Sequence, residues 1–282
     1  MRIKEQRHAF IGCESGYKDS KTVLFGAPFD GTSSYRAGSR FAPSAVRNES
    51  AGIETYSPYL DKDLVDSKVF DGGDLELPFG NAAKALKIIE NYTAQILKDG
   101  KKPLMIGGEH LITLGAFRAV YKAYPNLCVI HFDAHTDLRE DYAGEKLSHA
   151  TVIKRIWEFT GDGRIFQFGI RSGERSEFEW AKKHTFLTKF NFCGLEEAVA
   201  EIGERPVYLT IDLDVLDPSE MSGTGTPEAG GVRFTELLQA VNLAAKCNIV
   251  ACDINELSPP YDTSGASTAL ACKFIREVLL QL

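Results

Sequence analysis

The strongest constraint on the fold is a regular alternation of short apolar segments with longer segments of helical periodicity. The apolar segment 103–106 is followed by the helical pattern 111–124, and the segment 207–211 by the pattern 234–246. Strands that alternate with helices usually form a mainly parallel sheet with helices on both faces. We therefore predict an α/β fold, a three-layer αβα sandwich with a mostly parallel, doubly wound sheet. A closed (β/α)8 barrel is the structural alternative.

The same patterns place the other elements. Further strands are expected at 21–28, 69–71, 128–132, 164–170, 185–187 and 249–254, and further helices at 81–98, 148–160, 174–184, 195–202 and 265–282, with Asn81 as an N-cap and Pro43 near the start of a shorter helix. The chain has 282 residues, of which 44% are hydrophobic, so it can bury a large core. It contains no linker-like or low-complexity segment. We predict a single domain over residues 1–282.

Charge and cysteine content narrow the classes of function. The net charge is −7 and no basic cluster stands out, which argues against a nucleic-acid or anionic-membrane partner and suits a small cationic substrate. The six cysteines form no C-x-x-C pair, so buried free thiols in a reducing compartment are expected. Residues 1–8 lack the apolar core of a signal peptide, and no apolar run approaches the ~20 residues of a membrane span. We predict a cytoplasmic protein.

Three polar residues follow the apolar strand 128–132 at alternate positions, namely Asp133, His135 and Asp137. Alternate side chains of an extended segment point to the same side. Two carboxylates and an imidazole should therefore project together beyond the carboxyl end of this strand, which is where open α/β sheets bind their ligands. For this motif taken alone, an ordinary polar turn is the alternative.

A second acidic pair with the same spacing, Asp212 and Asp214, follows a later apolar strand, and His110 follows an earlier one. Taken singly, the pair could begin a turn, and His110 could be a hydrogen-bonded core histidine. We assign His131 to the core, as a buried histidine with satisfied hydrogen bonds and not as a ligand. The other six residues occur together at the ends of separate strands, and this joint occurrence predicts one shared site.

Four aspartates and two histidines suit a pair of divalent metal ions. Carboxylates bridge ions that lie ~3.5–4 Å apart, and oxygen ligands with a few imidazoles favour Mn²⁺ over a structural Zn²⁺. Two divalent ions balance four carboxylates, and a bridging hydroxide leaves one net negative charge. Such a centre accepts a cationic group and repels a phosphate. We therefore predict a hydrolase that cleaves a guanidinium group with two Mn²⁺ ions.

These residues resemble the metal motifs of the ureohydrolases, the arginase and agmatinase family. The motifs are Gly-Gly-Glu-His at 107–110, Phe-Asp-Ala-His-Thr-Asp at 132–137 and Asp-Leu-Asp-Val-Leu-Asp-Pro at 212–218. The loop 28–47, Gly-Thr-Gly-Thr-Pro-Glu at 223–228 and Glu-Leu-Ser-Pro at 256–259 extend the resemblance over nearly the whole chain. The resemblance implies an arginase-like fold and a homo-oligomer, either a trimer or a hexamer.

The resemblance also implies how the six residues would share two manganese ions. His110 and Asp137 would bind one ion, and His135 and Asp214 the other. Asp133 and Asp212 would bridge both ions, and Asp137 would also steady the bridging hydroxide by a hydrogen bond.

Three further residues would handle the substrate if the resemblance holds. Glu256 would bind the guanidinium through charge-assisted hydrogen bonds. Thr226 would contact the substrate, as would His149, which would also shuttle a proton to the leaving amine. His149 lies in Ser-His-Ala-Thr, where other members of the family carry a glycine. A surface histidine near a helix start is its alternative role.

The substrate is predicted from the segment 138–146, which carries three acids against two bases. This balance favours a guanidine without an α-carboxylate, and the segment resembles the agmatinase branch of the family. We predict hydrolysis of agmatine to putrescine and urea, a reaction of polyamine biosynthesis. The alternatives are a ureohydrolase for arginine, guanidinobutyrate or formiminoglutamate, a single-metal deacetylase of the same fold, and a non-catalytic metal-binding protein. Retention of both His110 and Asp214 argues against the single-metal design.

Overall fold

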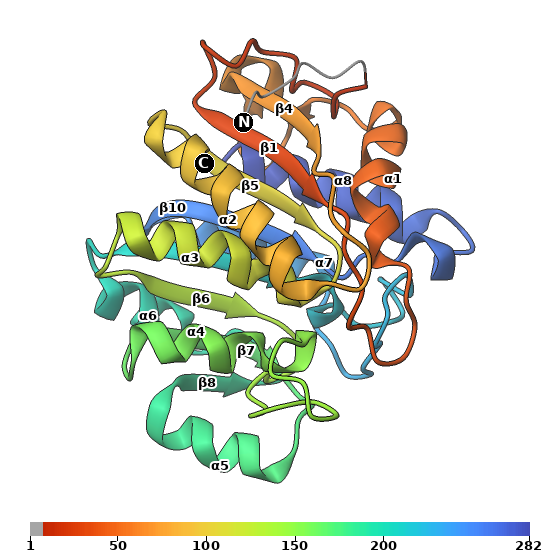
Figure 1. Ribbon diagram of the computed structural model, residues 1–282. Coiled ribbons are helices and arrows are strands. Elements are labelled where there is room, and N and C mark those ends of the chain that lie inside the picture. Colours follow the sequence, from red (N-terminus) through yellow and green to blue (C-terminus); the bar gives the residue numbers. More distant parts are fainter. Residues whose placement is uncertain (1–7) are drawn as a thin grey trace.

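The centre of the molecule is an eight-stranded sheet with the order β4-β1-β5-β10-β9-β6-β7-β8, seen in a computed structural model that describes residues 8–282 (Figure 1). Each pair of neighbouring strands is parallel. The strands are β1 (Thr22–Ala27), β4 (Val69–Asp74), β5 (Lys102–Gly107), β6 (Cys128–Phe132), β7 (Ile165–Ile170), β8 (Phe186–Lys189), β9 (Pro206–Asp212) and β10 (Asn248–Asn255).

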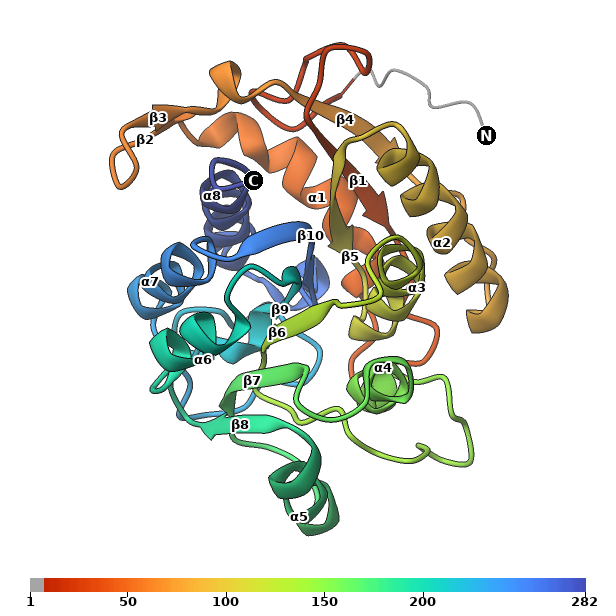
Figure 2. The same ribbon diagram turned by 90° about the vertical axis from the view of Figure 1, so that its left-hand side faces the viewer.

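Helices cover both faces of this sheet, as Figure 2 shows. One face carries α2 (Ala82–Lys98), α3 (Thr113–Ala123) and α4 (Val152–Thr160), and the other carries α1 (Ala42–Glu49), α6 (Leu195–Ile202), α7 (Phe234–Ala244) and α8 (Ala266–Leu279). The helix α5 (Arg175–His184) lies beside the edge strand β8. The predicted doubly wound sandwich is therefore confirmed. The barrel alternative is wrong, because β4 and β8 are the two outermost strands of the sheet and do not pair with each other.

Two hydrophobic cores hold the three layers together. Along β1, Leu24 packs into the core under α1 and α8, whereas its neighbours Val23 and Phe25 pack into the core under α2 and α3. Side chains alternate between the two faces of a strand, and here both faces are covered. A strand buried on both sides must be apolar at nearly every position, which explains the continuous apolar runs of the sequence.

Most predicted helix ends agree with the structure. Asn81 caps α2, since its Oδ1 accepts a hydrogen bond from the Lys84 backbone N–H at 2.9 Å, an interaction that contributes about 1 kcal/mol. Two predicted helices differ at their starts, where a 3-10 turn precedes the α-helix: η4 (His110–Ile112) and η5 (His149–Thr151). The short hairpin of β2 (Tyr56–Ser57) and β3 (Lys62–Asp63) was not predicted. The remaining 3-10 turns of the described residues are η1 (Ser39–Phe41), η2 (Ser50–Gly52), η3 (Leu64–Ser67), η6 (Leu213–Val215) and η7 (Pro259–Tyr261).

The strands of the sheet all end on the same side of the molecule, where their following loops gather (Figure 1). The loop after β1 lies directly against the loop after β5. A Cβ atom at Gly108 would lie 1.8 Å from the Phe29 carbonyl oxygen, and this same oxygen accepts the Glu109 backbone N–H at 2.8 Å. Only glycine permits so close an approach of two backbones. The Gly-Gly-Glu-His motif thus brings His110 to the shared rim.

Three smaller expectations concern the surface and the thiols. Five of the six cysteines are buried free thiols, as predicted, whereas Cys193 is exposed. Within the described residues, no helix combines the length and apolarity needed to cross a membrane. The expectation about a signal peptide concerns residues 1–8, and positions 1–7 lie outside the described part of the chain.

Candidate metal centre

The structure brings the predicted ligands together at the carboxyl ends of three strands. His110 opens η4 after β5, the segment 133–137 follows β6, Asp212 ends β9 and Asp214 lies in η6. All are buried except His135, which is partly exposed. Because β6 and β9 are neighbouring parallel strands, their carboxyl ends meet at the same edge of the sheet.

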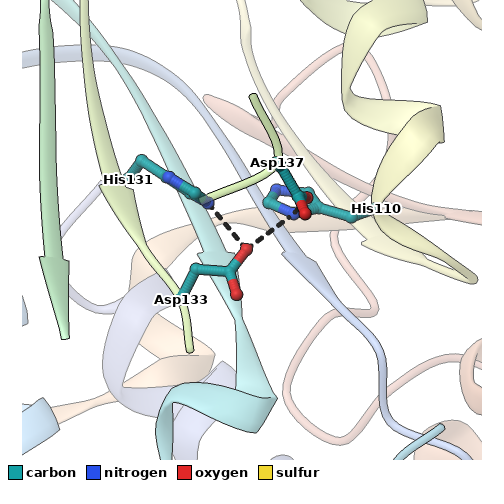
Figure 3. A group of neighbouring side chains, drawn as sticks. All are labelled: His110, His131, Asp133 and Asp137. Carbon is teal, nitrogen blue, oxygen red and sulfur yellow. Dashed lines mark hydrogen bonds and ion pairs between the residues drawn. The ribbon is translucent and has the colours of Figure 1, made fainter. Parts of the chain in front are cut away.

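The side chains form two groups that share Asp133. In the first group, His110 Nδ1 lies 3.0 Å from Asp133 Oδ2 and 3.0 Å from Asp137 Oδ2 (Figure 3), and 3.7 Å from Asp212 Oδ2. In the second, His135 Nδ1 lies 3.0 Å from Asp214 Oδ2 and 3.5 Å from Asp133 Oδ1. One oxygen of Asp133 thus faces each group, which is the arrangement that a bridging carboxylate requires.

The hydrogen bonds of His110 test whether this cluster suits a metal ion. Thr210 Oγ1 donates its single proton to Asp253 Oδ1 at 2.6 Å, so it must accept from His110 Nε2 at 2.8 Å. The neutral ring then carries its proton on Nε2 and directs the lone pair of Nδ1 toward the two carboxylates. Because this lone pair would face carboxylate oxygens at 3.0 Å, a cation must lie between them: a proton on Nδ1 serves in the metal-free cluster, and a divalent ion could take its place.

The pKa shifts of the cluster also indicate a site that suits divalent cations. Burial and the neighbouring charge of Asp133 raise the pKa of Asp137 to about 7, and burial together with Asp214 and Asp133 raises the pKa of Asp212 well above its usual range. Burial opposes the charged form of His110, but Asp133 and Asp137 outweigh it and raise the pKa of the imidazole well above normal. Only the histidines offset the crowded carboxylates in the metal-free cluster, and Asp137 and Asp212 are shifted toward their neutral forms, a charge imbalance that divalent cations would relieve. The residues present therefore fit such ions.

A cavity of about 240 Å³ opens onto this cluster. The metal-ligand candidates His110, His135, Asp137 and Asp212 lie in its wall. All three predicted substrate residues line it as well, namely His149, Thr226 and Glu256. The cavity therefore places a bound molecule in reach of both sets of residues.

Glu256 and Thr226 are fixed by contacts with the cluster itself. Glu256 Oε1 accepts the His110 backbone N–H at 2.8 Å, and the Thr226 hydroxyl donates to Asp214 Oδ2 at 3.3 Å. Glu256 and Asp137 both have left-handed backbone conformations, with φ of 65° and 53°. Such a conformation costs about 1–3 kcal/mol in a residue other than glycine, and this strain is concentrated at functional sites.

His149 is partly exposed at the start of η5 and forms part of the cavity wall. Its Nε2 lies 3.1 Å from Ser34 Oγ, and its backbone N–H donates to Thr32 Oγ1 at 3.2 Å. Burial lowers the pKa of the imidazole to about 4, so the ring is neutral near pH 7.

Sequence reasoning missed Glu174 and assigned the wrong acids to the mouth of the cavity. The acids of the segment 138–146 do not line the cavity, whereas Arg139 and Tyr142 of that segment do. The carboxylate at the mouth is Glu174, which pairs with Arg139 at 3.1 Å. Glu174 follows the carboxyl end of β7, so the rule that identified the metal residues applies to it as well.

The loop after β1 contributes Ser34, which sequence reasoning also missed. Glu109 fixes this loop by hydrogen bonds. Its buried carboxylate accepts hydrogen bonds from the Thr32 backbone N–H at 3.0 Å, from the Thr32 hydroxyl at 2.5 Å and from the Ser33 hydroxyl at 3.0 Å. A fully buried acid needs such donors. In the sequence, Glu109 could be noticed as an acid between apolar strand and helix patterns. Its hydrogen-bond partners could not, because they lie about 76 positions away in the chain.

Comparison with known proteins places these observations in context. The model of the Arginase family matches residues 20–281. An agmatinase of Bacillus anthracis is 49% identical over 275 residues, which are 96% of this chain and 95% of that protein. A guanidinobutyrase of Pseudomonas aeruginosa is 36% identical, over 92% of this chain and 86% of its own. The crystal structure of an agmatine ureohydrolase of Thermoplasma volcanium superposes with a TM-score of 0.90 at 35% identity, over 98% of this chain and 94% of that one.

Proposed function

Because the chain belongs to the arginase family, we propose that it is a binuclear manganese enzyme that hydrolyses agmatine to putrescine and urea. The observation that carries the proposal is the position of Asp133, whose two oxygens face two separate histidine–carboxylate groups beside the cavity that Glu256 lines.

Six side chains would hold the two ions, namely His110, Asp133, His135, Asp137, Asp212 and Asp214. When bound, the ions lower the pKa of a coordinated water and so supply a nucleophile near neutral pH. The oxygen-rich donor set without thiolates supports Mn²⁺ over a structural Zn²⁺. Two divalent ions would balance the four carboxylates, and a bound hydroxide would leave one net negative charge, which supports a cationic substrate.

The substrate guanidinium would bind to Glu256. Its carboxylate is held by the His110 backbone N–H, so one oxygen is fixed and the other, Oε2, can accept N–H groups of the guanidinium. A planar carboxylate and a planar guanidinium can form parallel hydrogen bonds. This contact would orient the guanidinium carbon toward the metal cluster.

His149 would move the proton that cleavage requires. Hydrolysis breaks a C–N bond and leaves an amine, which departs as a neutral molecule only after its nitrogen has been protonated. The imidazole lies in the cavity wall and is neutral, so it can accept a proton from the attacking side and pass it to the leaving nitrogen. Ser34, within 3.1 Å of Nε2, would keep the ring oriented.

The far end of the substrate supports agmatine over its rivals. Agmatine carries a second cation, an ammonium group, and Glu174 is a carboxylate at the mouth of the cavity. Guanidinobutyrate carries a carboxylate at that position, and Glu174 would compete with this carboxylate for Arg139, to which Glu174 is paired. The 49% identity to an agmatinase, against 36% to a guanidinobutyrase, points in the same direction.

The cell compartment and the assembly are also proposals. The free cysteines suit a reducing compartment, which supports a cytoplasmic location. Membership of the arginase family supports a trimer or a hexamer, and sedimentation equilibrium would distinguish these from a monomer.

A urea-release assay tests the proposed function. Purified protein is stripped with a chelator and assayed with agmatine, arginine and guanidinobutyrate, each with and without added Mn²⁺. We expect urea only when Mn²⁺ is present, with kcat/KM highest for agmatine. Higher kcat/KM with another guanidine would refute the substrate but keep the reaction class. Metal uptake without urea from any guanidine would support a non-catalytic metal-binding protein instead.

A further inference from the structure

His131 lies inside the metal cluster although it is not one of the proposed ligands. It is fully buried in β6, and its ring lies beside the His110 ring, with the centroids 5.0 Å apart (Figure 3). Its Nε2 lies 2.8 Å from Asp133 Oδ2. By distance alone, His131, His110, Asp133 and Asp137 could together hold an ion. Two neighbouring imidazoles therefore compete for the role of ligand.

The side-chain amide of Gln167 determines which tautomer the neutral His131 ring adopts. Gln167 Nε2 lies 2.9 Å from the Thr136 carbonyl oxygen, which can only accept a hydrogen bond. On the other side of the amide, the Thr185 hydroxyl donates to Gln167 Oε1 at 3.1 Å. A flipped amide would place two oxygens against each other at Thr136. The NH₂ group of Gln167 must therefore be the end that faces His131.

The tautomer follows from that orientation. Gln167 Nε2 also lies 3.1 Å from His131 Nδ1, and an NH₂ group donates, so Nδ1 must accept. The proton of the neutral ring is then on Nε2, and Nε2–H donates to Asp133 Oδ2. We propose that His131 is a positioning residue that holds this oxygen of the bridging carboxylate by a hydrogen bond and does not bind an ion.

The comparison with His110 shows how the fold assigns the two roles. In their neutral forms both rings carry the proton on Nε2, but they face opposite ways. The Nε2–H of His110 points to Thr210, away from the cluster, and its Nδ1 lone pair faces the carboxylates. The Nε2–H of His131 points to Asp133, and its lone pair faces Gln167. The buried partners of each ring, rather than the residue type, determine which histidine can be a ligand.

This hydrogen bond matters because Asp133 is the residue that faces both groups. Oδ2 accepts from His131, and Oδ1 accepts from the His135 backbone N–H. With both oxygens held, one lone pair on each stays free for an ion. Loss of a hydrogen bond that orients a metal ligand typically lowers metal affinity 10–100-fold. The inference rests on the metal site of the proposed function.

The tautomer can be read directly in the wild-type protein. We would label the histidines with ¹⁵N and record ring ¹⁵N shifts of the metal-free protein at mildly alkaline pH by magic-angle-spinning NMR, with His131 assigned through its backbone. The expected result is a neutral ring with the proton on Nε2. A proton on Nδ1, or on both nitrogens, would overturn the inference whether or not the protein binds metal.

A matched pair of variants tests the positioning role. His131→Gln keeps an N–H near the position of Nε2, whereas His131→Asn keeps a partner for Gln167 but loses the donor to Asp133. Mn²⁺ titration by calorimetry should show about 10–100-fold weaker binding of at least one ion in His131→Asn, with both ions still bound at saturation, and a much smaller loss in His131→Gln. Circular dichroism verifies that both variants are folded.

The outcomes separate the two proposals. A stoichiometry that falls to one ion in both variants would make His131 a ligand and overturn the inference, as would equal affinity in wild type and His131→Asn. If the wild type itself fails to bind two ions, the proposed function fails. The NMR result on the wild type does not depend on the folding of any variant, so it decides the hydrogen-bond arrangement in every case.

Discussion

Two buried acidic sites on the same sheet are balanced in opposite ways. Between α1 and β4, Arg47 binds both oxygens of the buried Asp71, at 2.7 and 2.9 Å, and also pairs with the exposed Asp74. At the carboxyl ends of β6 and β9, four aspartates gather around histidines. Within residues 8–282, no lysine or arginine forms an ion pair with these four.

The difference distinguishes acids that stabilise the fold from acids that serve the proposed metal site. Burial of a carboxylate without a partner costs several kcal/mol, so the chain supplies Arg47 where the acids only have to hold elements together. At the carboxyl ends of β6 and β9 it supplies no permanent cation of its own. We infer that the compensating charge comes from outside the chain, as two divalent ions. Four substitutions test this comparison, in order of decreasing expected effect.

Asp133→Ala should have the largest effect. Removal of the carboxylate that faces both histidine groups should abolish binding of both ions and lower agmatine turnover roughly 10⁴-fold or more, because metal assistance supplies several kcal/mol of transition-state stabilisation. Metal content by atomic emission and urea release measure the two effects. The control is Asp141→Ala, at an exposed position that does not line the cavity, and it should change neither metal content nor urea release. Retention of two ions by Asp133→Ala would contradict the bridging role.

Arg47→Met should change stability and leave metal binding intact. It removes the guanidinium that compensates Asp71, and an uncompensated buried charge lowers the free energy of unfolding by about 3–5 kcal/mol. Denaturant unfolding measures this change. Lys87→Met removes the exposed lysine of a pair with Glu90, which keeps Lys122 as a second partner, so this control should cost only about 0–1 kcal/mol. If Arg47→Met instead lost its ions while keeping its stability, the assignment of one acidic group to stability and the other to metal binding would be wrong.

Glu256→Gln should keep both ions and lose turnover. The neutral amide can no longer pair with the guanidinium, and loss of one partner from a buried charge pair costs about 2–5 kcal/mol, roughly 10²-fold or more in kcat/KM. The measurement is urea release from agmatine on samples whose metal content equals that of the wild type. Undiminished turnover would exclude Glu256 as the guanidinium site.

Glu174→Gln should have the smallest effect and depend on the substrate. The carboxylate is at the partly exposed mouth, so its contact with the distal ammonium contributes about 1 kcal/mol, which corresponds to roughly a fivefold rise in KM for agmatine with kcat unchanged. The KM for guanidinobutyrate should fall, because a carboxylate that competes for Arg139 is removed. Parallel changes for the two substrates would argue against a specific contact with the ammonium group.

The sequence predicted that the candidate ligands would lie together because one rule covers most of them. His110, His135 and the aspartates all follow apolar strands, and parallel strands end at a common rim, so position in the chain was enough to bring them together. The roles of Thr210 and Asp253 could not be predicted in this way. Both lie within buried strands, and what they do depends on which ring nitrogen of His110 faces them.

The parts of the fold that were missed depend on contacts between distant segments. The hairpin of β2 and β3 pairs over only two positions on each strand, too few to produce an alternating pattern. The loop after β1 takes its shape from Glu109, which binds Thr32 and Ser33. Local periodicity carries no information on such contacts, whereas it locates long helices such as α2 almost to the residue.

The most direct test of the central claim is a calorimetric titration of chelator-stripped wild-type protein with Mn²⁺, with urea release from agmatine measured on the same samples. We predict two ions bound per chain, no urea before they bind, and a rise in melting temperature as the acidic cluster is neutralised. Full urea release by the metal-free protein, or saturation without two bound ions, would contradict the account.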